Sequence, residues 1–594
     1  MPTDVVFFAM WTPELSQLVP YNDASNFLIA AWHELFDAFT PDTFQPRIHN
    51  IPSLVSELEN LSARLFNDLG DTRWKQHIHL VKDECRELIG ESQHVLQQMP
   101  EYSWHLNRLL SDDEPRQIQL NAAILKQRQI LFENQLFDQL ESTIATMPKT
   151  KEACHKALRS VATIALQQGK EDDDLLELDS FESSWPASKV ASRMKSIVEE
   201  KDQAFDCVFI ILGKKVTFLT QVGFHNFKRR QLPQDQINHL RTMYGEDGFH
   251  CVSITVTARS YRNAQSHAAT QLATALNVFN LHANAKELWI SPKSFVRVAG
   301  APKFRIFNQE EPAYRRLNRR NRVVEDTEES LELFFRDQID ERILNALELH
   351  ATALGSSEYR VRLVNLWSAL ECLSACCKGS SVIERVCELV TPILVWRRPD
   401  KLVRYLAIET KRFGDILGRH NYGAGFPRSR PDFVHPWDLM QTLSKPNKHS
   451  HLTEFFGLIG NHPYLRFRAM RLWKILNDPN ELLKSQEASA KRVRWQLYRI
   501  YRARNILVHQ GEEAPQFNAL LDNLMYYTSV VISRVLHGLK VDKSWRVREA
   551  WEYWRLKSEY VSDSLRNQAS VLTVGDFFPR SYDKGHAEPL WPKL

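Results

Sequence analysis

The sequence predicts a mainly α-helical protein with one mixed α/β unit near its middle. Apolar residues recur at three- and four-residue steps over roughly the first 200 residues and again from Glu328 to about Tyr560, which is the period of an α-helix. Near Phe205 the pattern changes to runs of β-branched and aromatic residues, which favour strands. With 594 residues the chain is too long for a single core, so we expect several domains.

Four segments follow from these patterns. Residues 1–204 form a helical N-terminal region, and residues 205–327 hold the α/β (or α+β) unit and a basic linker. Residues 328–565 form an all-α helical bundle, and residues 566–594 form an irregular tail. The last helices of the bundle are expected within "KRVRWQLYRIYRARNILVH", "FNALLDNLMYYTSVVISRVLHGL" and "SWRVREAWEYWRLKSEY".

Within the mixed unit, "FDCVFIILGKKVTFLTQVGF" is expected to form a hairpin, because two strand-like runs flank "GKK". Further strands are expected in "FHCVSITVTARS", "ELWISPKSFVRVAG" and "PKFRIFN", and a helix is expected in "YRNAQSHAATQLATALNVFNLH". Mixed sheets commonly form concave ligand sites, so this unit is the candidate sensor of the protein.

The composition limits the location and the chemistry of the protein. The N-terminus has no basic region and carries Asp4 inside its apolar run, so we expect no signal peptide, and no stretch reaches the roughly 18 apolar residues of a membrane span. We therefore expect a cytoplasmic protein without membrane contact. The eight cysteines form no CxxC pair, so reduced thiols are expected. No Cys/His/Asp cluster has the spacing of metal ligands, so we expect no metal and no other cofactor.

The basic residues point to a local site. A formal net charge of +4 does not by itself require a nucleic-acid partner. The densest basic stretch is "YRRLNRRNR", whose arginines are candidate RNA contacts because arginines bind phosphates. These candidates are Arg315, Arg316, Arg319, Arg320 and Arg322. A solvated linker between domains explains the stretch equally well, so both interpretations stay open.

Arg504 breaks the apolar pattern of the helix expected around residue 500. At 100° per residue it projects from the centre of an apolar stripe. The stripe comprises Val493, Leu497, Ile500, Leu507 and Val508. A buried arginine without a partner is costly, so one interpretation is a structural ion pair or a side chain that reaches solvent at the edge of the stripe. The other is that the stripe borders a cleft or a subunit interface, where Arg504 meets an anionic ligand.

His509 lies where this helix is expected to end, because Gly511 is a natural residue to follow a helix C-terminus. Histidine exchanges protons near neutral pH, and the helix dipole favours its protonated form there. An arginine and a histidine together suit phosphodiester chemistry. The arginine can neutralise phosphate charge in the transition state, and the histidine can move the proton of a ribose 2′-hydroxyl or of the leaving 5′-oxygen.

The stretch "RNILVH" matches the R-x4-6-H signature of HEPN domains (higher eukaryotes and prokaryotes nucleotide-binding), in the form in which a polar residue, Asn505, follows the arginine. "LYRIYRARNILVHQG" and "LLDNLMYYTSVVISRVL" resemble the last two core helices of an Apea-like HEPN domain. "LVNLWSALECLS", which contains Glu371, resembles an earlier helix. The resemblance covers about 230 residues, and an insert at roughly 400–490 departs from the usual pattern.

The resemblance implies an all-α domain that forms a homodimer in which two motifs face one cleft. Many members of the family are metal-independent endoribonucleases of antiphage defence, abortive infection or toxin–antitoxin systems. For this chain the resemblance implies RNA cleavage by transesterification to 2′,3′-cyclic phosphate ends, with Arg504, Asn505, His509 and Glu371 as site residues. The expected partners are RNA, a second copy of the chain, and a phage-derived trigger or an antitoxin-like regulator. The alternative is a catalytically inactive HEPN module that serves as a nucleotide- or RNA-binding or protein-interaction scaffold.

A free intracellular ribonuclease would kill its host, so its activity must be restrained. We therefore expect the N-terminal half to control the C-terminal bundle. A fragment from about Glu328 to the C-terminus is then expected to fold by itself.

Overall fold

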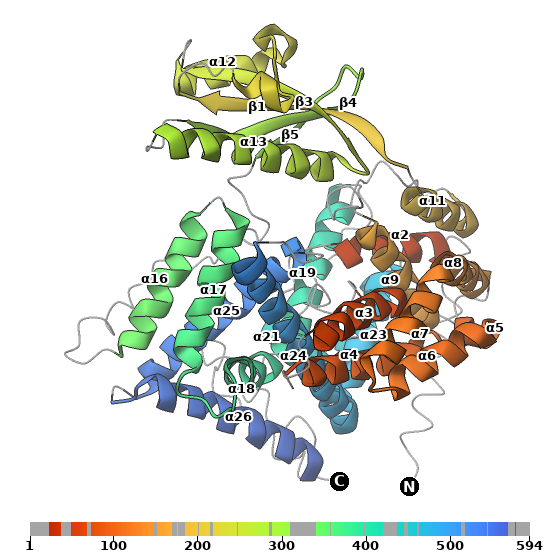
Figure 1. The fold of residues 1–594 in the computed structure, drawn as a ribbon. Coiled ribbons are helices and arrows are strands. Elements are labelled where there is room, and N and C mark those ends of the chain that lie inside the picture. The colour runs from red at the N-terminus through yellow and green to blue at the C-terminus, as the bar shows by residue number, and fades with distance from the viewer. Residues whose placement is uncertain are drawn as a thin grey trace. The chain divides into compact units, whose positions relative to one another are not determined.

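The structure is a computed structural model of the 594-residue chain, shown in Figure 1. It describes residues 23–36, 49–67, 73–145, 151–168, 175, 185–199, 201–213, 218–245, 248–283, 288–308, 340–356, 358–396, 398–419, 436–444, 449–459, 462–511, 517–542, 544–567 and 577. The fold is mainly helical, with 79% helix and a central five-stranded antiparallel sheet among the helices, which confirms the predicted fold class. Within the described residues, no helix is long and apolar enough to cross a membrane.

The chain divides into two compact units, and the division differs from the four predicted segments. The first unit comprises residues 1–160, 183–191 and 317–594, and the second comprises residues 161–182 and 192–316. The N-terminal helices therefore belong to the same unit as the C-terminal bundle.

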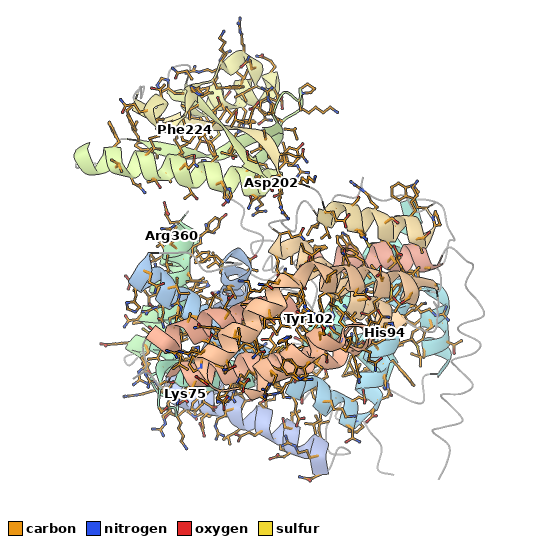
Figure 2. All side chains as sticks on the ribbon, turned by 45° about the vertical axis from the view of Figure 1, so that its right-hand side comes forward. Lys75, His94, Tyr102, Asp202, Phe224 and Arg360 are labelled. Atoms are coloured by element: carbon orange, nitrogen blue, oxygen red, sulfur yellow. The ribbon has the colours of Figure 1, made fainter. Side chains whose placement is uncertain are left out.

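The first unit is helical throughout its described part. Its N-terminal helices are α2 (Asp23–Phe36), α3 (Ile51–Asn67), α4 (Arg73–Glu91), α5 (Gln93–Gln98), α6 (Pro100–Ser111), α7 (Pro115–Gln127), α8 (Gln129–Ala145) and the first part of α9 (Lys151–Gln167). Its C-terminal helices are α16 (Glu341–Gly355), α17 (Tyr359–Ser374), α18 (Val382–Trp396), α19 (Arg398–Arg419), α21 (Pro436–Ser444), α22 (His449–Leu458), α23 (Pro463–Asn477), α24 (Pro479–Gln510), α25 (Phe517–Val541) and α26 (Val547–Asn567). Figure 2 labels Tyr102 in the N-terminal helices, where its ring stacks on that of Phe132 at 4.8 Å.

The second unit is a sheet with a helix on each face (Figure 1). The strands are β1 (Gln203–Leu212), β2 (His225–Asn226), β3 (Phe249–Ala258), β4 (Trp289–Val298) and β5 (Arg305–Asn308), in the spatial order β2-β3-β1-β4-β5. Side chains alternate between the faces of a strand. Phe209 of β1 accordingly packs with α13 (Tyr261–Ala283), and the adjacent Ile210 packs with α12 (Gln234–Tyr244).

The predicted hairpin at the start of the sheet is wrong. Its first half is β1, but its second half forms a short 3-10 helix, Phe218–Val222, and β1 pairs with β3 and β4 instead. Leu219 and Phe224 point into the core beneath α13. The run of apolar residues therefore reflects burial beside the sheet and does not indicate a strand. The other three predicted strands and the predicted helix are confirmed as β3, β4, β5 and α13.

The insert at 400–490 joins the N-terminal helices to the bundle. Arg468 of α23 donates from Nε to Oε2 of Glu34 of α2 at 2.9 Å, and both side chains are nearly buried. The hydroxyl of Tyr464 lies 3.2 Å from Nε2 of His155, and its ring meets that of Phe27 edge-on at 5.4 Å. The insert is therefore part of the core of the first unit.

Two arginines of α24 lie buried against α3 and α4. Arg499 donates from Nε to Oε2 of Glu57 at 3.0 Å and also pairs with Glu84, while Arg502 pairs with Glu57. Nη1 of Arg502 lies 3.1 Å from Nδ1 of His77. A guanidinium group can only donate, so Nδ1 of His77 is the acceptor. We call these five residues the buried ion network.

Burial and charge oppose each other in this network. Burial favours the neutral form of Glu57, but the guanidinium groups of Arg499 and Arg502 outweigh it and lower its pKa from 4.5 to about 2. Burial raises the pKa of Glu84, and Arg499 opposes that rise. Burial, together with Arg499, lowers the pKa of the nearby His49 well below 6.5. The network is therefore strongest when its carboxylates are ionised and His49 is neutral.

The network argues against the expectation that residues 328–594 fold alone. Both carboxylates come from α3 and α4, so such a fragment would leave Arg499 and Arg502 without them. The same fragment would also expose to water the face of α24 that α3 and α4 cover in the full chain. The N-terminal helices therefore contribute packing and charge compensation to the motif helix.

Substitution of Glu57 tests the network. We expect Glu57→Gln to lower the free energy of unfolding by about 3–5 kcal/mol, because two buried guanidinium groups lose their shared carboxylate. Glu59→Gln is the matched control on the same helix, since Glu59 pairs with the more exposed Lys126 and should cost less than about 1 kcal/mol. Urea unfolding of both variants measures the difference. Equal losses would show that the network does not carry the stability assigned to it.

His49 gives the stability a specific pH dependence. Its folded-state pKa lies below 6.5, so the unfolded chain binds the extra proton, and stability falls as the pH falls below 6.5. We expect His49→Gln to reduce this slope by at most about 1.4 kcal/mol per pH unit. The slope should not vanish, because burial also lowers the pKa of His350 and of His462. Unfolding between pH 7 and pH 5 measures the slope, and a His49→Gln variant with the wild-type slope would show that His49 does not bind the extra proton.

Candidate functional site

The helix that carries the motif is fixed at both ends by local contacts. Asp478 caps the N-terminus of α24 by accepting from the backbone N–H of Asn480 at 2.9 Å, and Pro479 takes the first helical position. Gly511 ends the helix in the left-handed conformation at φ 71°, and its N–H donates to the carbonyl of Leu507 at 3.0 Å. The expected end of this helix is thus observed, and the motif occupies its last two turns.

The burial of α24 differs from the predicted stripe in one respect. Val493, Leu497, Ile500 and Leu507 are buried as expected, but Val508 is 46% exposed. The opposite face of the helix is buried as well, through Arg499 and Arg502. The middle of α24 is therefore surrounded by protein, and its last turn emerges on the surface.

Arg504 is half-buried and forms no ion pair with the described residues, so of the two structural explanations the side chain that reaches solvent at the edge of the stripe is the one that remains. Its Nη1 donates to Oδ1 of the adjacent Asn505 at 3.1 Å, which is its only hydrogen bond within the described part of the chain. Its Nε is buried and has no hydrogen-bond partner there. Arg502, two residues earlier, is by contrast paired with Glu57. The guanidinium of Arg504 keeps donors that a ligand can use.

His509 is exposed in the last turn of α24. Among the described residues its imidazole has no hydrogen bond and no ion pair. On a regular helix it projects about 140° from Arg504 and only about 20° from Arg502. The structure therefore places Arg504 and Asn505 together and directs His509 to another side of the same helix.

Glu371 lies on α17, next to the motif helix but not within the motif. Its Oε1 accepts from the indole N–H of Trp367 at 2.6 Å, and the Trp367 ring lies 5.6 Å from that of Tyr501 on α24. No hydrogen bond or ion pair joins Glu371 to Arg504 or His509 within the described segments. Glu371 therefore orients Trp367 against α24, and its place in the site stays a prediction.

The remaining candidates add no site within the described residues. The basic stretch with Arg315, Arg316, Arg319, Arg320 and Arg322 lies outside the described residues. All eight cysteines are described and free. In the described part of the chain, no group of three or more His, Cys, Asp or Glu residues could hold a metal ion.

The inspection of the sequence missed the buried ion network. Arg499 and Arg502 are three residues apart and share a helix face, so their spacing was a usable signal. Their partners could not be found in the same way. Glu57 is 445 positions from Arg502, and no local pattern connects them.

Comparison with known proteins adds no identification. No protein-family model, no curated protein and no solved structure matches this chain.

Proposed function

We propose that the protein is a cytoplasmic endoribonuclease of the HEPN type, which cleaves RNA without a metal ion. The observation that carries the proposal is the contrast among the arginines of α24. Arg499 and Arg502 are held by buried carboxylates, whereas Arg504 has only the neutral Asn505, and His509 is exposed and unengaged within the described part. A cation and an imidazole left without structural partners are available to a phosphodiester.

The proposed reaction is an internal transesterification. His509, acting as a base, removes the proton of the ribose 2′-hydroxyl, whose oxygen attacks the adjacent phosphorus. The bond to the 5′-oxygen breaks, and that oxygen takes up a proton, which leaves a 2′,3′-cyclic phosphate and a 5′-hydroxyl. Arg504 neutralises the charge that builds on the phosphate oxygens, and Asn505 orients the guanidinium through its hydrogen bond.

A homodimer is part of this proposal. Arg504 and His509 diverge within one chain, so a second copy that meets the first at the end of α24 would bring further motif groups to the same phosphate. Val508 supports such an interface, because it is an exposed apolar side chain between Asn505 and Gly511. Two motifs would then line one cleft.

The biological role that fits such an activity is defence against phage or the action of a toxin. Both require restraint until a trigger or an antitoxin-like regulator acts. The second compact unit, which contains the sheet, remains our candidate sensor because it is built separately from the motif helix.

The first test compares two arginines of one helix. We expect Arg504→Ala to lower RNA cleavage by about 10²–10³ and His509→Ala by about 10²–10⁴, with little change in unfolding. Arg502→Ala should instead destabilise the protein, since it leaves Glu57 and Glu84 with one guanidinium. Cleavage of a labelled RNA in EDTA and calorimetric unfolding report the two effects.

Two outcomes would contradict the proposal. Wild-type cleavage by a well-folded His509→Ala variant would remove the histidine from the chemistry. RNA binding without any cleavage by the wild-type chain would favour the inactive binding scaffold.

A second test concerns the dimer. We expect Val508→Glu to yield a monomer with little RNA cleavage, because a carboxylate at an apolar twofold contact meets its own copy. Ile408→Glu on α19 is the matched control, since Ile408 is 45% exposed and Val508 is 46% exposed. Light scattering at micromolar concentration measures the assembly. A fully active monomer would show that the site is complete in one chain.

A further inference from the structure

Within α24, the motif brings no unpaired guanidinium group to the face that carries His509. Arg504 projects about 140° away around the helix, whereas Arg502, on nearly the same face as His509, is held by Glu57. A phosphate that reaches His509 therefore needs a cation from another element. On this face of α24, α3 and α4 cover Arg499 and Arg502 and leave His509 exposed.

The spacing of contacts between α3 and α24 identifies that cation. Glu57 of α3 pairs with Arg502 of α24. Seven residues further on each helix, which is close to two turns, come Arg64 and His509. The two helices run in the same direction here, because Nη2 of Arg64 donates to Oε1 of Gln510 at 3.4 Å. Arg64 is thus level with the last turn of α24.

Arg64 is held in place by an aromatic ring. Its guanidinium carbon lies 5.7 Å from the centre of the ring of Trp74, at the start of α4. This is a cation–π contact, which orients a guanidinium without neutralising it. Figure 2 labels the neighbouring Lys75, which is exposed and marks this end of α4. Arg64 has no carboxylate partner among the described residues, so no structural ion pair there neutralises its charge.

We infer that Arg64 binds the RNA phosphate at His509, and that Trp74 positions the Arg64 guanidinium for this contact. The inference rests on the proposed function, which it deepens by adding a residue from the N-terminal helices to the site. Arg64 binds the phosphate through charge-assisted hydrogen bonds from its N–H groups. It acts on the bound substrate and on the transition state alike, so it contributes mainly to affinity.

The test uses the full chain and a substrate that cannot react. A fluorescein-labelled single-stranded 2′-O-methyl RNA lacks the nucleophilic hydroxyl, so it reports binding alone. We expect Arg64→Gln to weaken its binding by about tenfold to a hundredfold. The slope of log K against log salt should become shallower by about 0.7, which is the change for one phosphate contact to a single strand. Arg64→Lys, which keeps the charge, should retain the wild-type slope.

The controls exploit a second arginine–tryptophan pair in the same unit. The guanidinium carbon of Arg108 lies 5.5 Å from the ring centre of Trp104, in the same kind of contact, on α6, which carries no residue of the candidate site. Arg108→Gln and Trp104→Ala should bind as the wild type does, whereas Trp74→Ala should weaken binding as Arg64→Gln does. Glutamine at position 64 can still hydrogen-bond to Gln510, so a loss in Arg64→Gln reports the charge and not the local contact.

The outcomes separate this inference from the proposed function. With a cleavable RNA, Arg64→Gln should raise KM and leave kcat nearly unchanged, whereas His509→Ala should lower kcat. If Arg64→Gln keeps the wild-type affinity and salt slope while His509→Ala abolishes cleavage, the role of Arg64 is overturned and the proposed function stands. If Arg64→Gln loses affinity and slope while His509→Ala cleaves normally, the phosphate contact stands and the proposed chemistry fails.

Discussion

The buried ion network between α24 and the helices α3 and α4 is the constraint on which the first unit depends. Two guanidinium groups lose their hydration there, and two carboxylates from distant parts of the chain compensate for it. The network also fixes the rotation of α24 about its axis. Once Arg499 and Arg502 face α3 and α4, helical geometry directs Arg504 about 160° away from Arg502 and brings His509 back toward α3. The orientation of both motif side chains is therefore a consequence of the network.

The sequence was sufficient to predict those elements whose determining interactions are local. Periodicity predicted the motif helix, α25 and three strands, and Gly511 predicted the end of α24, because spacing and caps act within a few residues. Prediction from the sequence failed where the surroundings of a residue come from distant parts of the chain. Residues 218–222 look like a strand, yet they pack as a 3-10 helix against the sheet. The sequence singled out Arg504 as the buried arginine, whereas Arg499 and Arg502 are buried because Glu57 and Glu84 lie more than 400 positions away.

The hydrogen bonding of Arg504 is informative in itself, apart from the position of this residue in a motif. Its Nε is buried without a hydrogen-bond partner in the described part of the chain, and its one bond goes to a neutral amide. Such a group is unfavourable for folding, because it loses water without gaining a carboxylate. Residues that break the agreement between local preference and fold tend to occur at functional sites. The two arginines before it show that this helix does pair its cations when they serve stability alone.

The N-terminal helices thus have two connected effects on the motif helix. Through Glu57 and Glu84 they make the burial of α24 possible, and through Arg64 they reach its exposed last turn. A shift of α3 along α24 would change the position of Arg64 relative to His509, and it would also move Glu57 away from Arg499 and Arg502. On the proposed function, a regulator that moves α3 would therefore act on phosphate binding and on the packing of α24 together. If the proposed function holds, control and chemistry need not reside in separate domains, because the helices α3 and α24 connect them.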